Sequence, residues 1–165
     1  MVFKSPGLQA VGVLETEREG TARSVTLASM SLHDAACSGD LENLRHRIAR
    51  GDDVDGRINT GWTPLMYACE MGHHECAQAL IGAGAAVDMV DNINGYTALM
   101  CACVSGRQEC AQALLNAGAA VDRVDNYGRT ALMRACFSGH HDCARALIAA
   151  DAAVDVVDNG GWTAL

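Results

Sequence analysis

A short segment recurs along this 165-residue chain at nearly constant intervals, and no other feature limits its fold more strongly. The four copies are GWTPL, GYTAL, GRTAL and GWTAL, which begin at Gly61, Gly95, Gly128 and Gly161. Successive copies therefore lie 34, 33 and 33 residues apart. Self-similarity at such a period is typical of a solenoid, in which each unit packs only against its neighbours in the chain.

Each unit has the pattern of two short helices followed by a turn. In the second unit, Thr63 is a suitable N-cap and Pro64 a suitable first helical residue. Apolar residues then recur at helical spacing as far as Gly72, which breaks the helix. A second helix is expected over about 74–81, with Gly84 placed for the left-handed position after its end. The segment that follows has turn chemistry rather than helical periodicity.

The 33-residue period, the T-P-L-x-x-A signature that begins at Thr63 and the helix–turn–helix pattern resemble the ankyrin repeat. The resemblance covers roughly residues 29–165 and implies an all-α solenoid of stacked helix–turn–helix units with protruding β-hairpin turns. Residues 1–28 are then expected to form a flexible N-terminal tail. The expected units are approximately 29–57, 58–90, 91–124 and 125–157, followed by a partial unit at 158–165.

Two departures from the ankyrin pattern bear on local structure. The family usually has a histidine after T-P-L, which His33 keeps and which Met66, Met100 and Met133 replace. The threonine-to-histidine hydrogen bond of the family is therefore not expected in the central units. Asp151 stands where the second and third units have glycine, so we expect a positive φ that a non-glycine residue adopts at some cost.

Cysteine and histidine lie close together in CEMGHHEC (69–76) and CFSGHHDC (136–143), and both residue types are ligands of zinc. The third copy, CVSGRQEC (103–110), lacks the histidines. Both cysteine columns fall on core positions of the family, where a free cysteine packs as a small hydrophobe. We therefore expect no metal and no cofactor, and a thiol- or metal-binding protein is the weakest alternative. The cysteines expected in the core are Cys69, Cys76, Cys103, Cys110, Cys136 and Cys143.

Two further cysteines lie outside these columns. Cys37 aligns with positions expected at the surface, and no neighbouring base or helix N-terminus is evident that would activate its thiol. The pattern assigns no redox role to Cys37 or to Cys101.

Charge and hydropathy exclude several classes of partner. The formal net charge is −8 and the chain has a single lysine, Lys4, so it offers no basic surface for nucleic acid. No run of about 18 apolar residues occurs, and insertion into a membrane is not expected. Residues 1–28 lack the apolar core of a signal peptide, which favours a cytoplasmic or nuclear location.

The resemblance to ankyrin repeats implies that the partner is another protein, bound on a concave surface formed by the turns and the first helices. Aromatic residues and arginine are the usual energetic anchors of such interfaces, and five of the seven aromatics of the chain fall on this surface. The alternative for Trp62, Tyr96 and Trp162 is packing against the next turn. The matching positions are Arg57, Asn59, Trp62, Glu70, Met71, Asn92, Asn94, Tyr96, Val104, Asn126, Tyr127, Arg129, Phe137 and Trp162.

No catalytic signature accompanies the repeats. The chain has no nucleophile elbow, P-loop, H-E-x-x-H or dinucleotide fingerprint. We therefore expect a non-enzymatic scaffold or adaptor. The alternative is a section of a larger enzyme or channel, in which the repeats recruit a substrate or position the chain.

The two ends of the solenoid differ. The second helix of the first unit has Asn43, His46 and Arg47 where the next unit has cysteine, alanine and leucine, so this helix is expected to face water. At the other end the sequence stops at Leu165, where a fifth helix pair would begin. The hypothesis that follows is a fragment, or a C-terminal face covered by a partner or by self-association.

Overall fold

A computed structural model of the chain describes residues 30–165, and the tail expected at 1–28 lies outside the described residues. Residues Ser31–Leu165 form a compact unit. It is helical, and the predicted all-α repeat solenoid is confirmed. The helices are α2 (Leu32–Ser38), α3 (Leu41–Ala49), α4 (Pro64–Met71), α5 (His74–Gly82), α6 (Ala98–Val104), α7 (Gln108–Asn116), α8 (Ala131–Phe137) and α9 (His141–Ala149).

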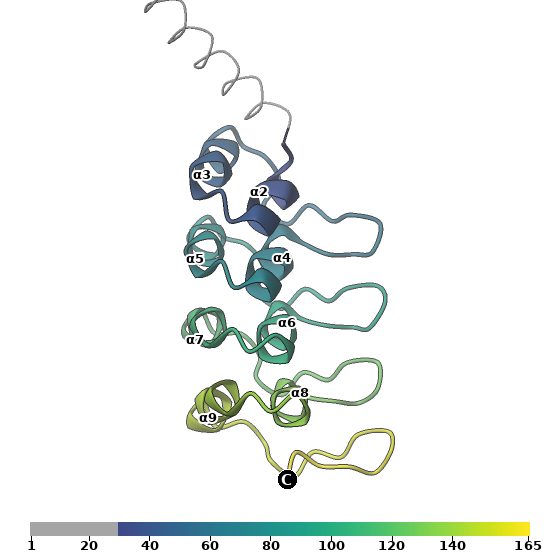
Figure 1. Cartoon of the computed structure of the whole chain (residues 1–165). Coiled ribbons are helices and arrows are strands. Elements are labelled where there is room, and N and C mark those ends of the chain that lie inside the picture. Colours follow the sequence, from purple (N-terminus) through teal and green to yellow (C-terminus); the bar gives the residue numbers. More distant parts are fainter. Residues whose placement is uncertain (1–29) are drawn as a thin grey trace, which may run out of the picture. The chain divides into compact units, whose positions relative to one another are not determined.

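The helices form two layers (Figure 1). The first helices of the units, α2, α4, α6 and α8, stack in one layer, and each packs against the next along the chain. The second helices, α3, α5, α7 and α9, stack beside them, and a long loop projects from the first-helix side between one unit and the next. The loops have the shape of hairpins, but between residues 30 and 165 the only isolated β-bridge joins Val124 and Thr130.

Local signals in the sequence explain where the first helices begin and end. The hydroxyl of Thr63 accepts a hydrogen bond from the amide of Met66 at 3.3 Å, and the corresponding threonines cap α6 and α8 in the same way. Helix α4 ends at Met71, and the residue that caps it, Gly72, has a left-handed φ of 84°. Asp151 has the expected positive φ, at 59°. The second helix of this unit runs from His74 to Gly82, one residue beyond its expected end.

The core is built from leucines and small residues. Leu65, Leu99 and Leu132 of the first helices are buried, as are the leucines of the second helices at the same interfaces. The methionines that replace the family histidine are buried too. His33, which keeps the histidine, uses Nε2 to contact the carbonyl oxygen of Gly56 at 2.9 Å. Alanines fill the remaining inward positions and let neighbouring helices approach closely.

The burial of the cysteines corrects one expectation. Five of the six cysteines assigned to the core are buried, but Cys136 is exposed. Its counterparts Cys69 and Cys103 are covered by the first helix of the following unit, and Cys136 has no such helix over it in this sequence. Cys37, expected at the surface, is half-buried, and Cys101 is buried.

The first unit corrects a second expectation. Asn43 was expected to face water, but its side chain is 0% exposed. The residue occupies the same inward position of its helix as Cys76 does in α5, and helix geometry buries it although it is polar. Neither its Oδ1 nor its Nδ2 has a hydrogen-bond partner. His46 is exposed as expected, whereas Arg47 is half-buried and pairs with Asp52.

Candidate functional site

Each of the last three loops is organised around a buried aspartate. In the loop before α6, Oδ1 of Asp91 accepts hydrogen bonds from the backbone amides of Ile93 at 2.8 Å and Asn94 at 2.6 Å. Asp125 and Asp158 do the same in the following loops. The sequence signal for this role is the Asp-Asn pair that recurs at these positions, and the expected site residues do not include these aspartates. The aspartates fix the loop backbone and therefore the positions of the exposed side chains at the loop tips.

Successive loops are also bonded to one another. The amide of Asn92 donates to the carbonyl oxygen of Thr60 at 2.8 Å, and the amide of Asn126 donates to that of Asn94 at 2.9 Å. Arg57 adds a contact between loops, since its Nη2 donates to the carbonyl oxygen of Val90 at 2.6 Å. Arg57, Asn92 and Asn126, which are among the residues assigned to partner binding, thus also join neighbouring loops. Their side chains remain exposed.

An arginine in the last turn of α8 organises the aromatic side chains. The guanidinium of Arg134 lies 4.8 Å from the ring centre of Tyr96 and 5.7 Å from that of Tyr127. Its Nε donates to Oδ2 of Asp125 at 2.8 Å, and the Asp125 side chain is fully buried. Arg134 was not among the expected site residues, because it occupies a column that is apolar in the family. A charged residue in a column that is apolar in the family is the sequence signal that could have identified Arg134 as a site residue.

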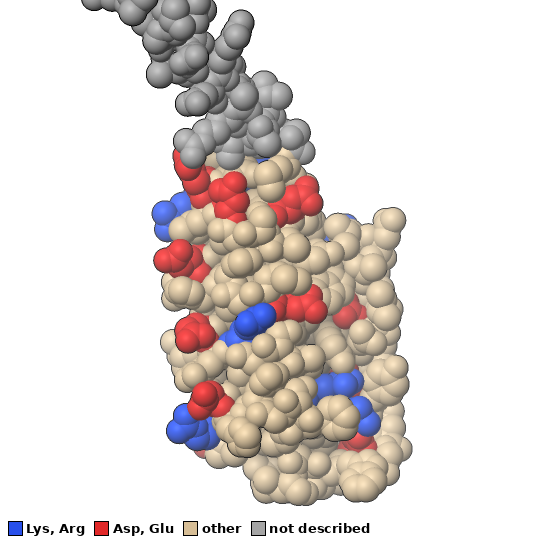
Figure 2. All heavy atoms as spheres, in the orientation of Figure 1, with Lys and Arg blue, Asp and Glu red and all other residues tan. Residues whose placement is uncertain are grey.

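A second arginine holds the neighbouring part of the surface. The guanidinium of Arg129 lies 5.9 Å from the ring centre of Tyr127 and 6.0 Å from that of Phe137. Its Nε donates to Oδ2 of Asp158 at 2.8 Å, and this bond holds the pKa of the Asp158 carboxyl below its usual value. Carboxylates therefore balance the charges of Arg129 and Arg134. Figure 2 shows basic atoms at the level of α8 with acidic atoms just below them and uncharged atoms on the other sides.

The surface left exposed around these arginines is aromatic. Tyr127 is 53% exposed and Phe137 is 84% exposed. The cation–π contacts and the loop bonds hold the cluster in place. We call Tyr96, Tyr127, Arg129, Arg134 and Phe137 the aromatic–arginine cluster.

The other expected site residues lie outside this cluster. Trp62 is half-buried, with its ring centre 4.9 Å from that of Tyr67, and both rings pack against the core. Glu70 is also half-buried, and burial raises the pKa of its carboxyl. Asn59 and Met71 are exposed, whereas Asn94 and Val104 are half-buried.

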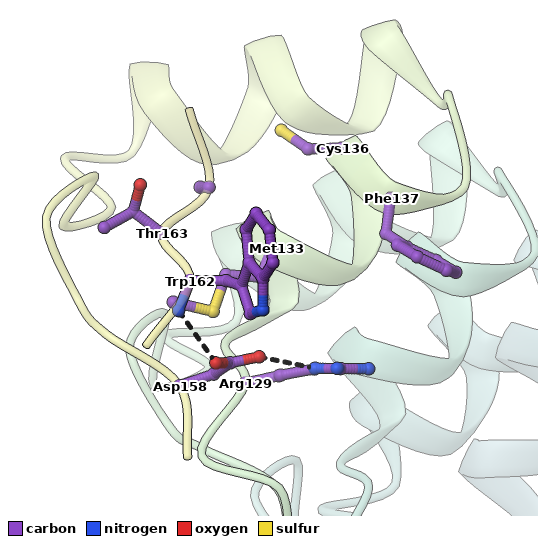
Figure 3. Close-up of a pocket in the computed structure, with 8 residues that line it drawn as sticks. Arg129, Met133, Cys136, Phe137, Asp158, Trp162 and Thr163 are labelled. Atoms are coloured by element: carbon purple, nitrogen blue, oxygen red, sulfur yellow. Dashed lines mark hydrogen bonds and ion pairs between the residues drawn. The ribbon is translucent and has the colours of Figure 1, made fainter. Parts of the chain in front are cut away.

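Trp162 borders a hollow at the C-terminal end of the fourth unit, which shares Arg129 and Phe137 with the aromatic–arginine cluster (Figure 3). The hollow has a volume of about 440 Å³. Trp162 and Met133 lie side by side in it, above the Arg129–Asp158 pair, and Cys136 and Phe137 lie along its other side. Its lining is thus apolar apart from one ion pair and the hydroxyl of Thr163.

The cysteine–histidine segments are used between units. Nε2 of His73 contacts the carbonyl oxygen of Cys37 at 3.1 Å, and that of His140 contacts the carbonyl oxygen of Val104 at 3.0 Å. Among residues 30–165, no three histidine, cysteine or acidic side chains are grouped to hold a metal ion. Burial raises the pKa of the Cys101 thiol, which favours the protonated form over the thiolate that binds metal. No helix of this part of the chain is both long and apolar enough to cross a bilayer.

We expect no stoichiometric metal in the purified, reduced and dialysed protein, because one histidine of each segment, His73 or His140, contacts a backbone carbonyl instead. Elemental analysis by plasma mass spectrometry checks this expectation. One zinc ion per chain, lost together with stability on chelation, would contradict it.

Comparisons with known proteins agree with the architecture. A family model described as ankyrin repeats (3 copies) matches residues 32–125 and 117–165. Protein phosphatase 1 regulatory subunit 27 of Mus musculus is 38% identical over 77 residues, which are 43% of this chain and 50% of that protein. Ankyrin repeat and SOCS box protein 1 of Mus musculus is 44% identical over 69 residues, which are 36% of this chain and 20% of that protein. The match covers half of the first relative and a smaller share of the second.

Proposed function

Because this chain belongs to the ankyrin-repeat family, we propose that it is a non-enzymatic scaffold or adaptor that binds a partner protein through its loops and first helices. Ankyrin repeats are generally protein-interaction modules, and the relatives named above include a regulatory subunit. The observation that carries the proposal is the aromatic–arginine cluster. It presents two exposed rings on a backbone that buried aspartates and bonds between loops already hold in place.

The chemistry of the cluster indicates what kind of partner surface would fit. Tyr127 and Phe137 offer a large apolar area, and their charged neighbours Arg129 and Arg134 already have carboxylate partners. A partner that offered only acidic groups would have to compete with Asp125 and Asp158 for the two guanidinium groups. An apolar or aromatic segment with polar groups at its rim fits better, because it buries the rings without separating the ion pairs.

A second candidate role is substrate recruitment within a longer enzyme or channel. The observation in its favour is that the matched segment makes up only 20% of ankyrin repeat and SOCS box protein 1. The same binding surface would serve an adaptor or a substrate-recruiting section of an enzyme. The identity of the captured partner distinguishes these two roles.

Replacing Tyr127 and Phe137 together by alanine should weaken partner binding by at least about tenfold, since large exposed aromatics carry much of the energy of such interfaces. Partners would be captured from cell extract by tagged protein and identified by quantitative mass spectrometry. The dissociation constant of each captured partner would then be measured with purified components.

Ile148→Ala is the matched control, because Ile148 is a similarly exposed apolar residue on α9, in the other helix layer. The control should capture the same partners as the unmodified protein. Equal capture by all three proteins would rule out the cluster as the binding surface. A loss of unfolding free energy as large as the loss of binding energy would show that the two rings serve the fold.

A further inference from the structure

The third unit lacks the cation that the fourth unit has between its loop and its first helix. In the fourth unit, Arg134 of α8 pairs with the buried Asp125 of the preceding loop. Asp91 and Cys101 hold the corresponding positions one unit earlier. The buried Oδ2 of Asp91 has no hydrogen-bond partner, and Cys101 is a buried free thiol. The negative charge of Asp91 is therefore not balanced as that of Asp125 is.

Glu70 is a second carboxylate without a counter-charge on the same side of the stack. It lies in the last turn of α4 and aligns with Val104 and Phe137 of the following first helices. None of the ion pairs between residues 30 and 165 includes it. Arg107 contacts this residue through the backbone, since its Nε donates to the carbonyl oxygen of Glu70 at 3.1 Å. The half-buried carboxylate is thus left unpaired.

The pKa values of neighbouring groups reflect this unbalanced negative charge. Burial raises the pKa of the Glu70 carboxyl, and no positive charge opposes the rise. Burial also raises the pKa of the Tyr67 hydroxyl, and nearby negative charge that includes Glu70 raises it further. The pKa of the Cys101 thiol is raised first by burial and then by the charges of Glu70 and Asp91. The side of α4 and α6 that faces these groups therefore favours a positive charge.

The cluster at the other end of this surface does not oppose a basic partner. Carboxylates already pair with Arg129 and Arg134, so neither arginine presents an unbalanced positive charge. The chain as a whole has a formal net charge of −8. A partner segment with a positive charge is therefore attracted on approach, and an acidic segment is repelled.

The positions of Glu70 and Phe137 set a distance between the two sites. Helix α4 packs against α6, and α6 packs against α8, so the two residues are two helix interfaces apart. Packed helices have axes about 8–10 Å apart, which gives a separation of roughly 16–20 Å. An extended segment advances about 3.3 Å per residue, so about five or six residues span this distance.

We propose that the partner carries a lysine or arginine that pairs with Glu70, about five or six residues from an aromatic or large apolar residue that docks at the aromatic–arginine cluster. This inference rests on the proposed function, because the cluster is its second anchor. Between the two anchors the segment passes Val104, which is half-buried and apolar. The residues that join the anchors therefore need no charge of their own.

The test begins with a library of random peptides of about twelve residues displayed on phage, roughly twice the expected span. Selection against the whole chain should enrich peptides that contain an aromatic residue and a lysine or arginine about five or six positions apart. A synthetic copy of an enriched peptide would be labelled with fluorescein. Its dissociation constant would then be measured by fluorescence anisotropy.

Glu70→Gln should raise the dissociation constant of this peptide at least about tenfold, because glutamine keeps the size of the side chain and removes the charge. Added salt should weaken binding to the unmodified protein more than binding to the variant. The variant should not lower the midpoint of denaturant unfolding, since it removes a half-buried charge that has no partner. A loss of binding would then not be a loss of fold.

Two controls isolate the charge pair. Glu75→Gln removes an exposed carboxylate from the first turn of α5, in the other helix layer, and should leave the dissociation constant unchanged. A peptide with methionine in place of its lysine or arginine should bind more weakly than the parent peptide. This second peptide should also bind the unmodified protein and the Glu70→Gln variant equally, because the pair is then absent in both.

Enrichment of peptides without a basic residue would overturn the proposal, and so would equal affinity of the selected peptide for the unmodified protein and Glu70→Gln. If such a peptide still lost affinity when Tyr127 and Phe137 were both replaced by alanine, the proposed function would stand without this inference. Peptides that depended on Glu70 but not on the two rings would instead contradict the role of the cluster. A selection that enriched no peptide would count against both proposals.

Discussion

Replacing Asp125 by asparagine should lower the free energy of unfolding by about 3 kcal/mol, the scale of breaking a buried ion pair by removing one partner. The Asp125 side chain is fully buried and Arg134 is only 12% exposed. Oδ2 of Asp125 binds the Arg134 guanidinium while Oδ1 accepts the amides of Tyr127 and Arg129. An asparagine can keep the amide bonds but would leave the guanidinium without its counter-charge. Denaturant titration followed by circular dichroism measures the loss.

Asp91→Asn is the matched control for this substitution. Asp91 also accepts loop amides through Oδ1, but its buried Oδ2 has no hydrogen-bond partner. Asparagine there keeps the amide bonds and removes an unpaired charge, so the free energy of unfolding should change by less than about 1 kcal/mol. Equal losses in the two variants would show that the aspartates act through the loop amides alone, and that the pair with Arg134 contributes nothing.

Leu99→Ala should destabilise the protein by about 2–5 kcal/mol, as large-to-small changes in packed cores do. Leu99 is 1% exposed and lies in α6, which packs against both α4 and α8. Neighbours on two sides limit how far the structure can relax into the space left by the removed atoms. The loss would be measured by the same denaturant titration.

Leu165→Ala provides the comparison at an exposed leucine. Leu165 aligns with Leu99 in the repeat but is 88% exposed, so its replacement should change stability by less than about 0.5 kcal/mol. A similar loss for both leucines would mean that burial at the repeat interfaces does not set the stability of the stack.

The sequence predicted the repeat architecture because the signals that define it are local. The threonine caps, the left-handed glycines and the spacing of the leucines each lie within one unit and recur in register. The column logic failed at Cys136, which has the residue type and position of its column but is exposed, because burial depends on what lies against each face. At Asn43 the residue type misled instead: a polar side chain predicted exposure, whereas its position in the column, which is buried in the other units, decided the outcome.

The candidate site was harder to predict for a different reason. Arg57 and Asn92 were assigned to partner binding from their place in the loops, yet both also bond to neighbouring loops. Whether a polar side chain points towards a partner or along the stack depends on the spacing between loops, and no single unit encodes that distance. The aromatic–arginine cluster likewise draws on two units, since Tyr96 comes from the third and Arg134 from the fourth.

The bonds between successive loops have a kinetic consequence. A loop that moved independently would have to be ordered when a partner bound, and that entropy would slow association or weaken the complex. Here the amide of Asn126 donates to Asn94 in the preceding loop, and the amide of Asn159 donates to Tyr127 in the loop that contains Asn126. The three loop tips therefore move together. A protein that contacts two tips therefore meets a surface ordered in advance. Its rate of association would be set by diffusion and orientation, and variants of the tips would alter chiefly its residence time.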